Sequence, residues 1–275
     1  MDQQVKTNFH TPLSRRDILR HAVGGGLLAG LGLLSTGCGG GGTTPTTLRP
    51  RRALIWSERT RHTEIYPYDV NGAVAAGIAP LLPSWWQVQT AHVDEPEQGL
   101  SAAAIDAADV IVWFAHVRHG EVTDAAAEHI ASRVRDGGMG FIALHSGSWG
   151  GKPFHRITGH TGDWTGGAQI LGESHRIQVA APEHPIARGI TDFTIPEDER
   201  FLGTFQGPPP DTVVFDGIYE KDGMRAAQGI AWTIGNGRVF YFRPGHETFP
   251  VYFQPEVRRV LRNAVLWTAG DEAAI

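Results

Sequence analysis

Short apolar runs alternate with helical patterns through the middle of the chain. The runs at residues 53–57, 109–115 and 139–144 are bounded by polar or turn residues, as expected of strands covered on both faces. Residues 86–91 alternate between apolar and polar and predict a further strand. Apolar positions at helical spacing predict helices between them, over residues 70–82, 101–107 and 124–135. Strand and helix in this order predict right-handed crossovers and a parallel sheet.

The second half of the chain has a different pattern. Its apolar runs are separated by turn residues rather than by helices, and they predict strands over residues 169–180, 212–219, 227–233 and 238–242. A closing helix begins near Pro255, with Val257, Leu261 and Val265 on one stripe. The chain therefore reads as an α/β protein with a mostly parallel sheet, helices on both faces, and extra antiparallel strands in its second half.

The first 38 residues read as an export signal. Arg15 and Arg16 form a twin-arginine pattern, and the apolar run over residues 22–34 that follows contains five glycines. That run is shorter than the roughly 20 apolar residues that span a bilayer. A buried or membrane-spanning helix is the alternative interpretation of this run.

The chain's single cysteine, Cys38, is the last residue of this predicted export signal, or leader. Its context, Leu34 to Gly37, is similar to the lipid-attachment box of bacterial lipoproteins, and ordinary cleavage nearby is the alternative. Residues 39–52 are rich in glycine and threonine and predict a flexible tether. We expect the folded domain at residues 53–269 and a short tail at 270–275, with the protein periplasmic or lipid-anchored at the cell envelope.

Composition narrows the class of protein further. The 275 residues are 41% hydrophobic and favour a single domain with a substantial core. The formal net charge is −5, and without residues 1–38 it becomes −7, with 20 basic and 27 acidic side chains. This charge argues against nucleic acid as a partner. One cysteine permits no internal disulfide and no thiolate zinc cluster, so the 13 histidines are the unusual count.

Histidines follow several of the predicted strands. In open parallel sheets ligands bind beyond the carboxyl ends of the strands. The polar residues placed there are Glu58, His62, His116, His119, His145, Ser146, Arg243, His246 and Glu247. A single loop histidine is more often satisfied by backbone groups, but four strand ends that deliver histidine to one edge indicate a site.

Two kinds of chemistry fit these residues. Neutral imidazoles with a carboxylate suit a zinc-like divalent metal with an open coordination position. Alternatively, His145 or His246 acts as a general base with Ser146 as nucleophile, although Ser146 lacks the Gly-x-Ser-x-Gly surroundings of a hydrolase elbow. Trp164 lies in a predicted loop and could stack on a sugar ring; a place in the core is its other interpretation.

Six segments together resemble the trehalose-utilisation (ThuA-like) family. They are Trp56-x-Glu58 with Arg61-His62 and Ile65-Tyr66-Pro67, Asp94-Glu95-Pro96-Glu97-x-Gly99-Leu100, His116-x-x-His119-x-Glu121-Val122, Leu144-His145-Ser146-Gly147, His184-Pro185-Ile186, and Phe242-Arg243-Pro244-Gly245-His246-Glu247-Thr248. The resemblance implies a flavodoxin-like domain similar to class I glutamine amidotransferases. Those enzymes carry a nucleophilic cysteine on the turn where this chain has His145-Ser146, so thiol-dependent glutamine hydrolysis is excluded. The predicted export differs from the family pattern, because the best-known members of the family are thought to be cytoplasmic.

The resemblance implies work on a disaccharide such as trehalose or on a keto-sugar, by metal-assisted hydrolysis, lyase or isomerase chemistry. We expect His116, His145 and His246 to hold the metal and Glu247 or Glu58 to move protons. The residues expected to contact the sugar are His62, His119, Ser146, Trp164 and Arg243. The alternative is a non-catalytic periplasmic sugar-binding lipoprotein. We expect no nucleotide cofactor, and a membrane contact through a lipid anchor, or none if the leader is simply cleaved. A homo-oligomer is a further expectation.

Overall fold

The computed structural model describes residues 49–60, 62–149, 152–166 and 169–275. The predicted signal, Cys38 and most of the predicted tether lie outside these residues. The described residues belong to one unit that spans residues 48–275. Among them, no helix has the length and apolar character needed to cross a membrane.

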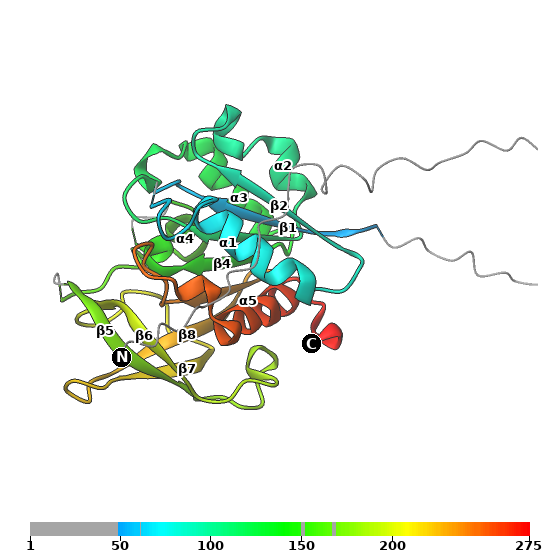
Figure 1. The fold of residues 1–275 in the computed structure, drawn as a ribbon. Coiled ribbons are helices and arrows are strands. Elements are labelled where there is room, and N and C mark those ends of the chain that lie inside the picture. The colour runs from blue at the N-terminus through cyan, green and yellow to red at the C-terminus, as the bar shows by residue number, and fades with distance from the viewer. Residues whose placement is uncertain (1–48, 61, 150–151, 167–168) are drawn as a thin grey trace, which may run out of the picture. The chain divides into compact units, whose positions relative to one another are not determined.

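Five parallel strands form the first part of the sheet (Figure 1). They are β1 (Arg51–Ser57), β2 (Trp86–His92), β3 (Val110–Phe114), β4 (Gly140–Leu144) and β9 (Gly237–Phe242), in the order β2-β1-β3-β4-β9. This is the 2-1-3-4-5 order of flavodoxin-like sheets, in which the order of strand addition reverses between β1 and β3. The predicted α/β class with a parallel first half is confirmed.

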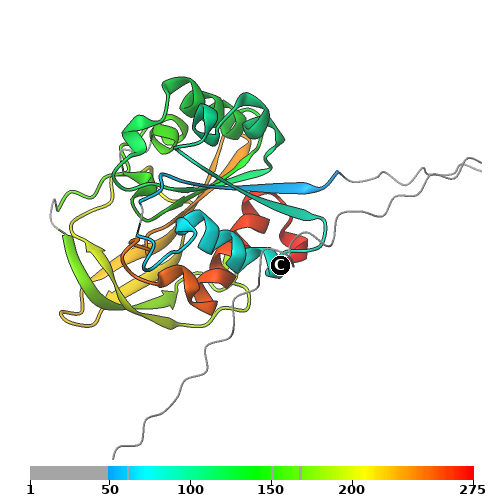
Figure 2. The ribbon, with the colours of Figure 1, turned by 45° about the horizontal axis from the view of Figure 1, so that its top comes forward.

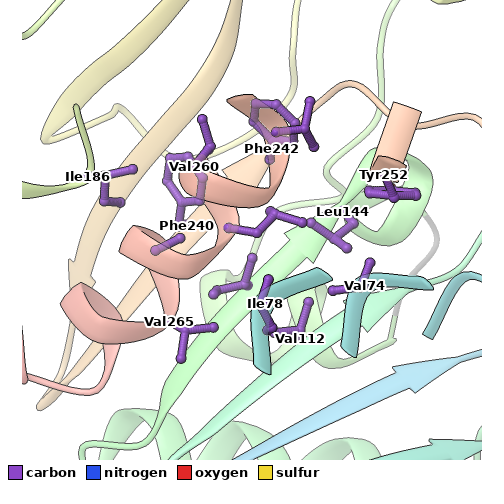
Figure 3. Close-up of a cluster of buried hydrophobic side chains, with 14 of the residues drawn as sticks. Val74, Ile78, Val112, Leu144, Ile186, Phe240, Phe242, Tyr252, Val260 and Val265 are labelled. Atoms are coloured by element: carbon purple, nitrogen blue, oxygen red, sulfur yellow. The ribbon is translucent and has the colours of Figure 1, made fainter. Parts of the chain in front are cut away.

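Helices cover both faces of these strands (Figure 2). Helices α1 (Asp69–Ile78) and α5 (Pro255–Thr268) pack on one face, and α2 (Ala102–Ala107), α3 (Asp124–Arg135) and α4 (Lys152–Thr158) pack on the other. Because side chains alternate along a strand, β3 sends Val112 to the α1/α5 face and Trp113 to the opposite face. Figure 3 shows the α1/α5 core, where Val74 and Ile78 approach Val112.

Antiparallel strands extend the same sheet beyond β9. They are β8 (Arg225–Ile234), β7 (Thr212–Tyr219), β5 (Gln169–Val179) and β6 (Phe193–Phe201), in that order, which gives nine strands in the described part of the chain. The extra antiparallel strands of the prediction are confirmed. Two elements were not predicted: β6, whose pattern is interrupted by Pro196 and an acidic run, and the short helix α4.

Two predicted boundaries need correction. Strand β1 begins at Arg51, inside the expected tether, because Arg51 pairs with Trp86 and the backbone N–H of Arg52 donates to the Asp109 carboxylate at 2.8 Å. Helix α1 ends at Ile78 rather than at residue 82, since Pro80 cannot continue an α-helix and Ala79–Leu81 form a 3-10 turn.

Candidate functional site

Loops that follow β3, β4 and β9 bring three histidines together. The ring centroids lie 5.4 Å apart for His116 and His145, 4.9 Å for His116 and His246, and 5.3 Å for His145 and His246. Glu247 joins them, and one potential ligand atom from each of the four residues lies within 4.8 Å of the others. The cluster therefore sits at the carboxyl edge of the parallel strands, where such sheets bind ligands.

Each imidazole is oriented by a partner at Nδ1. His116 Nδ1 lies 2.8 and 2.9 Å from the two carboxylate oxygens of Glu247. His145 Nδ1 lies 3.2 Å from the carbonyl oxygen of Arg243, and His246 Nδ1 accepts the backbone N–H of Thr248 at 3.2 Å. Acceptor oxygens like those that face His116 and His145 fix the ring orientation of histidines in metal sites.

His145 occupies a strained position directly after β4. Its side chain is fully buried and its backbone has φ 51°, a left-handed conformation that non-glycine residues rarely adopt. Strain of this kind costs on the order of 1–3 kcal/mol and concentrates at functional sites. The turn His145–Ser148 thus aims the His145 ring into the cluster at the expense of local stability.

Strand β6 adds two buried carboxylates that the sequence analysis missed. Glu199 Oε2 lies 2.9 Å from His145 Nε2, yet no described residue makes a hydrogen bond of acceptable angle to either oxygen of Glu199. Asp198 accepts the backbone N–H groups of Gly245 at 2.8 Å and His246 at 2.9 Å. No local signal marks Glu199, because Glu197 shares its alternate position in β6 and is exposed.

Burial and the imidazoles determine the pKa values in the cluster. Burial raises the pKa of Glu247, but its hydrogen bonds with His116 and the electrostatic effect of the three imidazoles together outweigh that cost and lower the pKa to about 2. Burial lowers the pKa of His246 to about 4. Burial opposes the charged form of His116, but Glu247 raises its pKa above the usual value. Near neutral pH, Glu247 is therefore ionised and His246 is neutral.

Glu58 is buried beneath the loop that carries His116. Its two carboxylate oxygens accept the backbone N–H groups of Val117 at 2.6 Å and Arg118 at 2.7 Å. This geometry makes Glu58 a support for the loop, in addition to the proton-transfer role predicted for it. His62, by contrast, is partly exposed and lies outside the cluster, with its Nδ1 3.1 Å from Glu64.

The other predicted sugar contacts are spread around the cluster. His119 is half-buried, its ring centroid lies 5.5 Å from that of Trp149 in a T-shaped arrangement, and burial lowers its pKa. Ser146 is buried in the turn after β4. Trp164 is partly buried, and the guanidinium carbon of Arg243 lies 4.0 Å from the centroid of its ring. Because that face of Trp164 is occupied, the more exposed Trp149 (45%) offers the freer aromatic surface.

The strand order and the buried cluster define an α/β protein with a histidine- and carboxylate-lined site at the carboxyl edge of a flavodoxin-like sheet. A family model described as ThuA, trehalose utilisation, matches residues 52–268. The chain belongs to this family, as its motifs predicted.

Solved structures agree with this assignment at the level of the fold. A ThuA-like protein from Bacteroides uniformis is 16% identical, with a TM-score of 0.55 over 83% of this chain and 95% of that chain. A cytoplasmic protein from Salmonella typhimurium is 12% identical, with a TM-score of 0.54 over 78% and 98%. A search of curated proteins finds no match to this sequence.

Proposed function

We propose that this protein is a metal-dependent enzyme of carbohydrate metabolism that acts on a trehalose-like disaccharide or on a keto-glycoside. The observation that carries the proposal is the cluster of His116, His145, His246 and Glu247 at the carboxyl edge of the sheet. The family's link to trehalose utilisation supplies the substrate class.

The residues present fit a divalent metal. Imidazole and carboxylate are the ligands that zinc and similar ions take in catalytic sites. His145 Nε2 and both oxygens of Glu199 are buried without a hydrogen-bond partner among the described residues. Buried polar atoms left unpaired are costly, so their convergence supports a cation as the missing partner.

A bound divalent ion would supply Lewis acidity toward a sugar carbonyl or a bound water. The chain's own groups do the remaining work in this proposal. Glu247, ionised and bonded to His116 Nδ1, holds that ring in place and keeps a proton on Nδ1. His119, Ser146 and His62 are assigned to substrate contacts, while Arg243 acts by holding Trp164 and the backbone carbonyl that orients His145.

The proposal also places the enzyme outside the cytoplasm, exported by the twin-arginine route and anchored through a lipid on Cys38. The support for this is the arginine pair, the short apolar run and the position of Cys38 in the sequence. The mildly acidic domain is consistent with a small-molecule substrate and with no nucleic-acid partner.

Incubation with sugars tests the activity. The full-length protein, loaded with Zn²⁺ or Mn²⁺, is mixed with trehalose and with 3-keto-trehalose, and products are followed by mass spectrometry and NMR. We expect product from the keto-sugar and none after chelation, with His116→Gln inactive and His129→Gln, on the distant helix α3, unchanged. Tight sugar binding by calorimetry without any product would instead favour the sugar-binding lipoprotein.

A further inference from the structure

The partners of the three Nδ1 atoms determine which ring nitrogen carries the proton. A carboxylate and a carbonyl oxygen can only accept, so Nδ1 of His116, facing Glu247, and Nδ1 of His145, facing the Arg243 carbonyl, must each be the donor. In the neutral ring the other nitrogen then has a free lone pair. Nε2 of His116 and Nε2 of His145 are therefore available as metal ligands.

His246 has the opposite arrangement. The backbone N–H of Thr248 can only donate, and it points at His246 Nδ1 at 3.2 Å, with the Thr248 hydroxyl at 2.8 Å. The same motif occurs in this chain at His184, whose Nδ1 accepts the backbone N–H of Ile186 at 3.2 Å. With the Nδ1 lone pair engaged, the neutral His246 ring carries its proton on Nε2 and has no lone pair left for a metal.

The contact between His145 and Glu199 requires a positive charge, which either a second proton on His145 Nε2 or a bound metal ion can supply. The lone pair of His145 Nε2 lies 2.9 Å from Glu199 Oε2, and both side chains are fully buried. Two lone pairs at that distance repel unless a positive charge lies beside them. Two ligand atoms bonded to one tetrahedral zinc at about 2.0–2.1 Å lie roughly 3.3 Å apart, close to the separation seen here.

Glu247 already has a different partner. Both of its oxygens lie within 2.9 Å of His116 Nδ1. This is the carboxylate–histidine arrangement in which the acid orients a ligand without binding the metal itself.

We propose that Nε2 of His116, Nε2 of His145 and the carboxylate of Glu199 hold the divalent ion. Glu247 is then a positioning residue for His116, and His246 donates its Nε2–H to the bound substrate rather than to the metal. This assignment rests on the proposed function, and it replaces His246 by Glu199 in the ligand set expected from the sequence.

Zinc affinity, measured apart from activity, tests the assignment. The full-length protein and its variants compete for Zn²⁺ with a chromophoric chelator, and Co²⁺ absorption reports the ligand environment. We expect Glu199→Gln and His145→Gln to weaken binding by more than the roughly 10–100-fold that loss of an outer partner costs, and Glu247→Gln to fall within that range. His246→Gln should stay within about threefold of the wild type because no metal bond is lost.

Matched variants control for folding. Glu197→Gln makes the same change at an exposed position of β6, and His184→Gln removes a histidine with the same hydrogen-bond motif far from the cluster; both should bind Zn²⁺ as the wild type does. Glu199→Asp keeps the charge and should bind more tightly than Glu199→Gln. Circular dichroism establishes that each variant is folded.

Two results would overturn the assignment and can be told apart. If the wild type binds Zn²⁺ but His246→Gln loses it as fully as His145→Gln does, or folded Glu199→Gln retains it, the assignment fails and the proposed function stands. If the wild type binds neither Zn²⁺ nor Co²⁺, the metal-dependent function itself fails and the assignment with it.

Discussion

The carboxylate of Asp198 accepts the backbone N–H of His246 at 2.9 Å, so a strand of the antiparallel half positions a residue of the candidate site. The same carboxylate accepts the N–H of Gly245 at 2.8 Å, and it is fully buried. The loop after β9 thus takes its shape from β6 as well as from its own strand.

The variant Asp198→Asn tests whether the Asp198 carboxylate supports the loop after β9. An asparagine offers one acceptor oxygen, and its NH₂ group would face one of the two N–H donors. We expect a loss of about 2–4 kcal/mol in the free energy of unfolding, measured by urea denaturation at pH 7. Glu197→Gln, the exposed neighbour, is the control. A variant as stable as the wild type would show that Asp198 does not hold the loop.

Glu58→Gln separates support of the loop from proton transfer. One of the two backbone N–H groups, of Val117 or Arg118, loses its acceptor, and we expect a loss of about 1.5–3 kcal/mol in unfolding free energy. If Glu58 acts by support, the pH–rate profile keeps its shape while the rate falls. Loss of one limb of that profile would instead identify Glu58 as the proton-transfer group.

Gly245→Ala should distort the site loop. Gly245 has φ 126°, and an added Cβ would lie 2.1 Å from the Tyr252 hydroxyl. We expect a loss of at least about 2 kcal/mol in unfolding free energy together with weaker Zn²⁺ binding. Gly223→Ala is the matched control, since it also has positive φ but meets no atom within 4 Å; it should cost about 1–2 kcal/mol and leave Zn²⁺ binding unchanged. Equal effects of the two substitutions would contradict the steric argument.

His175 should make the protein sensitive to acid. Its ring is buried in β5 and faces Asp198, Arg243 and Tyr219. Burial lowers its pKa from 6.5 to about 3, so the unfolded chain binds more protons than the folded one between these values. Stability from this group is present above pH 6.5 and falls as pH drops toward 3, by about 1.4 kcal/mol per pH unit.

His175→Phe keeps an aromatic ring against Tyr219 and removes the titration. Urea denaturation between pH 4 and 6.5 should give a slope of free energy against pH that is smaller by about 1.4 kcal/mol per unit. At pH 7 the change in stability should stay within about 1.5 kcal/mol. An unchanged slope would mean that His175 does not titrate differently in the two states.

The variant Cys38→Ala tests the proposal that a lipid on Cys38 anchors the protein to a membrane. In a bacterial host with twin-arginine export, we expect the full-length protein to incorporate a labelled fatty acid and to sediment with membranes. The variant should lose the label and appear in the soluble fraction. A wild type that is exported but carries no label would show ordinary cleavage of the leader. Export itself is tested by Arg15→Lys together with Arg16→Lys, which should retain the protein in the cytoplasm.

The parallel half of the fold was predictable because its signals are local. Strands β3 and β4 are buried along their whole length and helix α3 has an apolar stripe, so 110–114 and 124–135 were located closely. Strand β6 was not, because Pro196 and three successive charged acids interrupt an alternation that only the neighbouring strand β5 makes stable.

The histidines of the candidate site could also be predicted from the sequence. His116, His145 and His246 follow strands whose parallel order places their ends together, and topology brought the three rings within 5.4 Å. His62 also follows a strand, but its loop leads it away toward Glu64. Glu199 comes from an antiparallel strand, and its approach to His145 depends on tertiary packing that no local pattern encodes.

Strand β9 lies between β4 and β8, parallel to the first and antiparallel to the second. A fragment that ends at Gly166 would contain His116 and His145 but neither Glu199 nor His246. On the ribosome, the complete site cannot exist until residues beyond 246 have left the exit tunnel and β9 has been inserted between its neighbours. If the cluster binds a metal, loading must therefore come late in synthesis, and a prematurely terminated product would lack residues of the site.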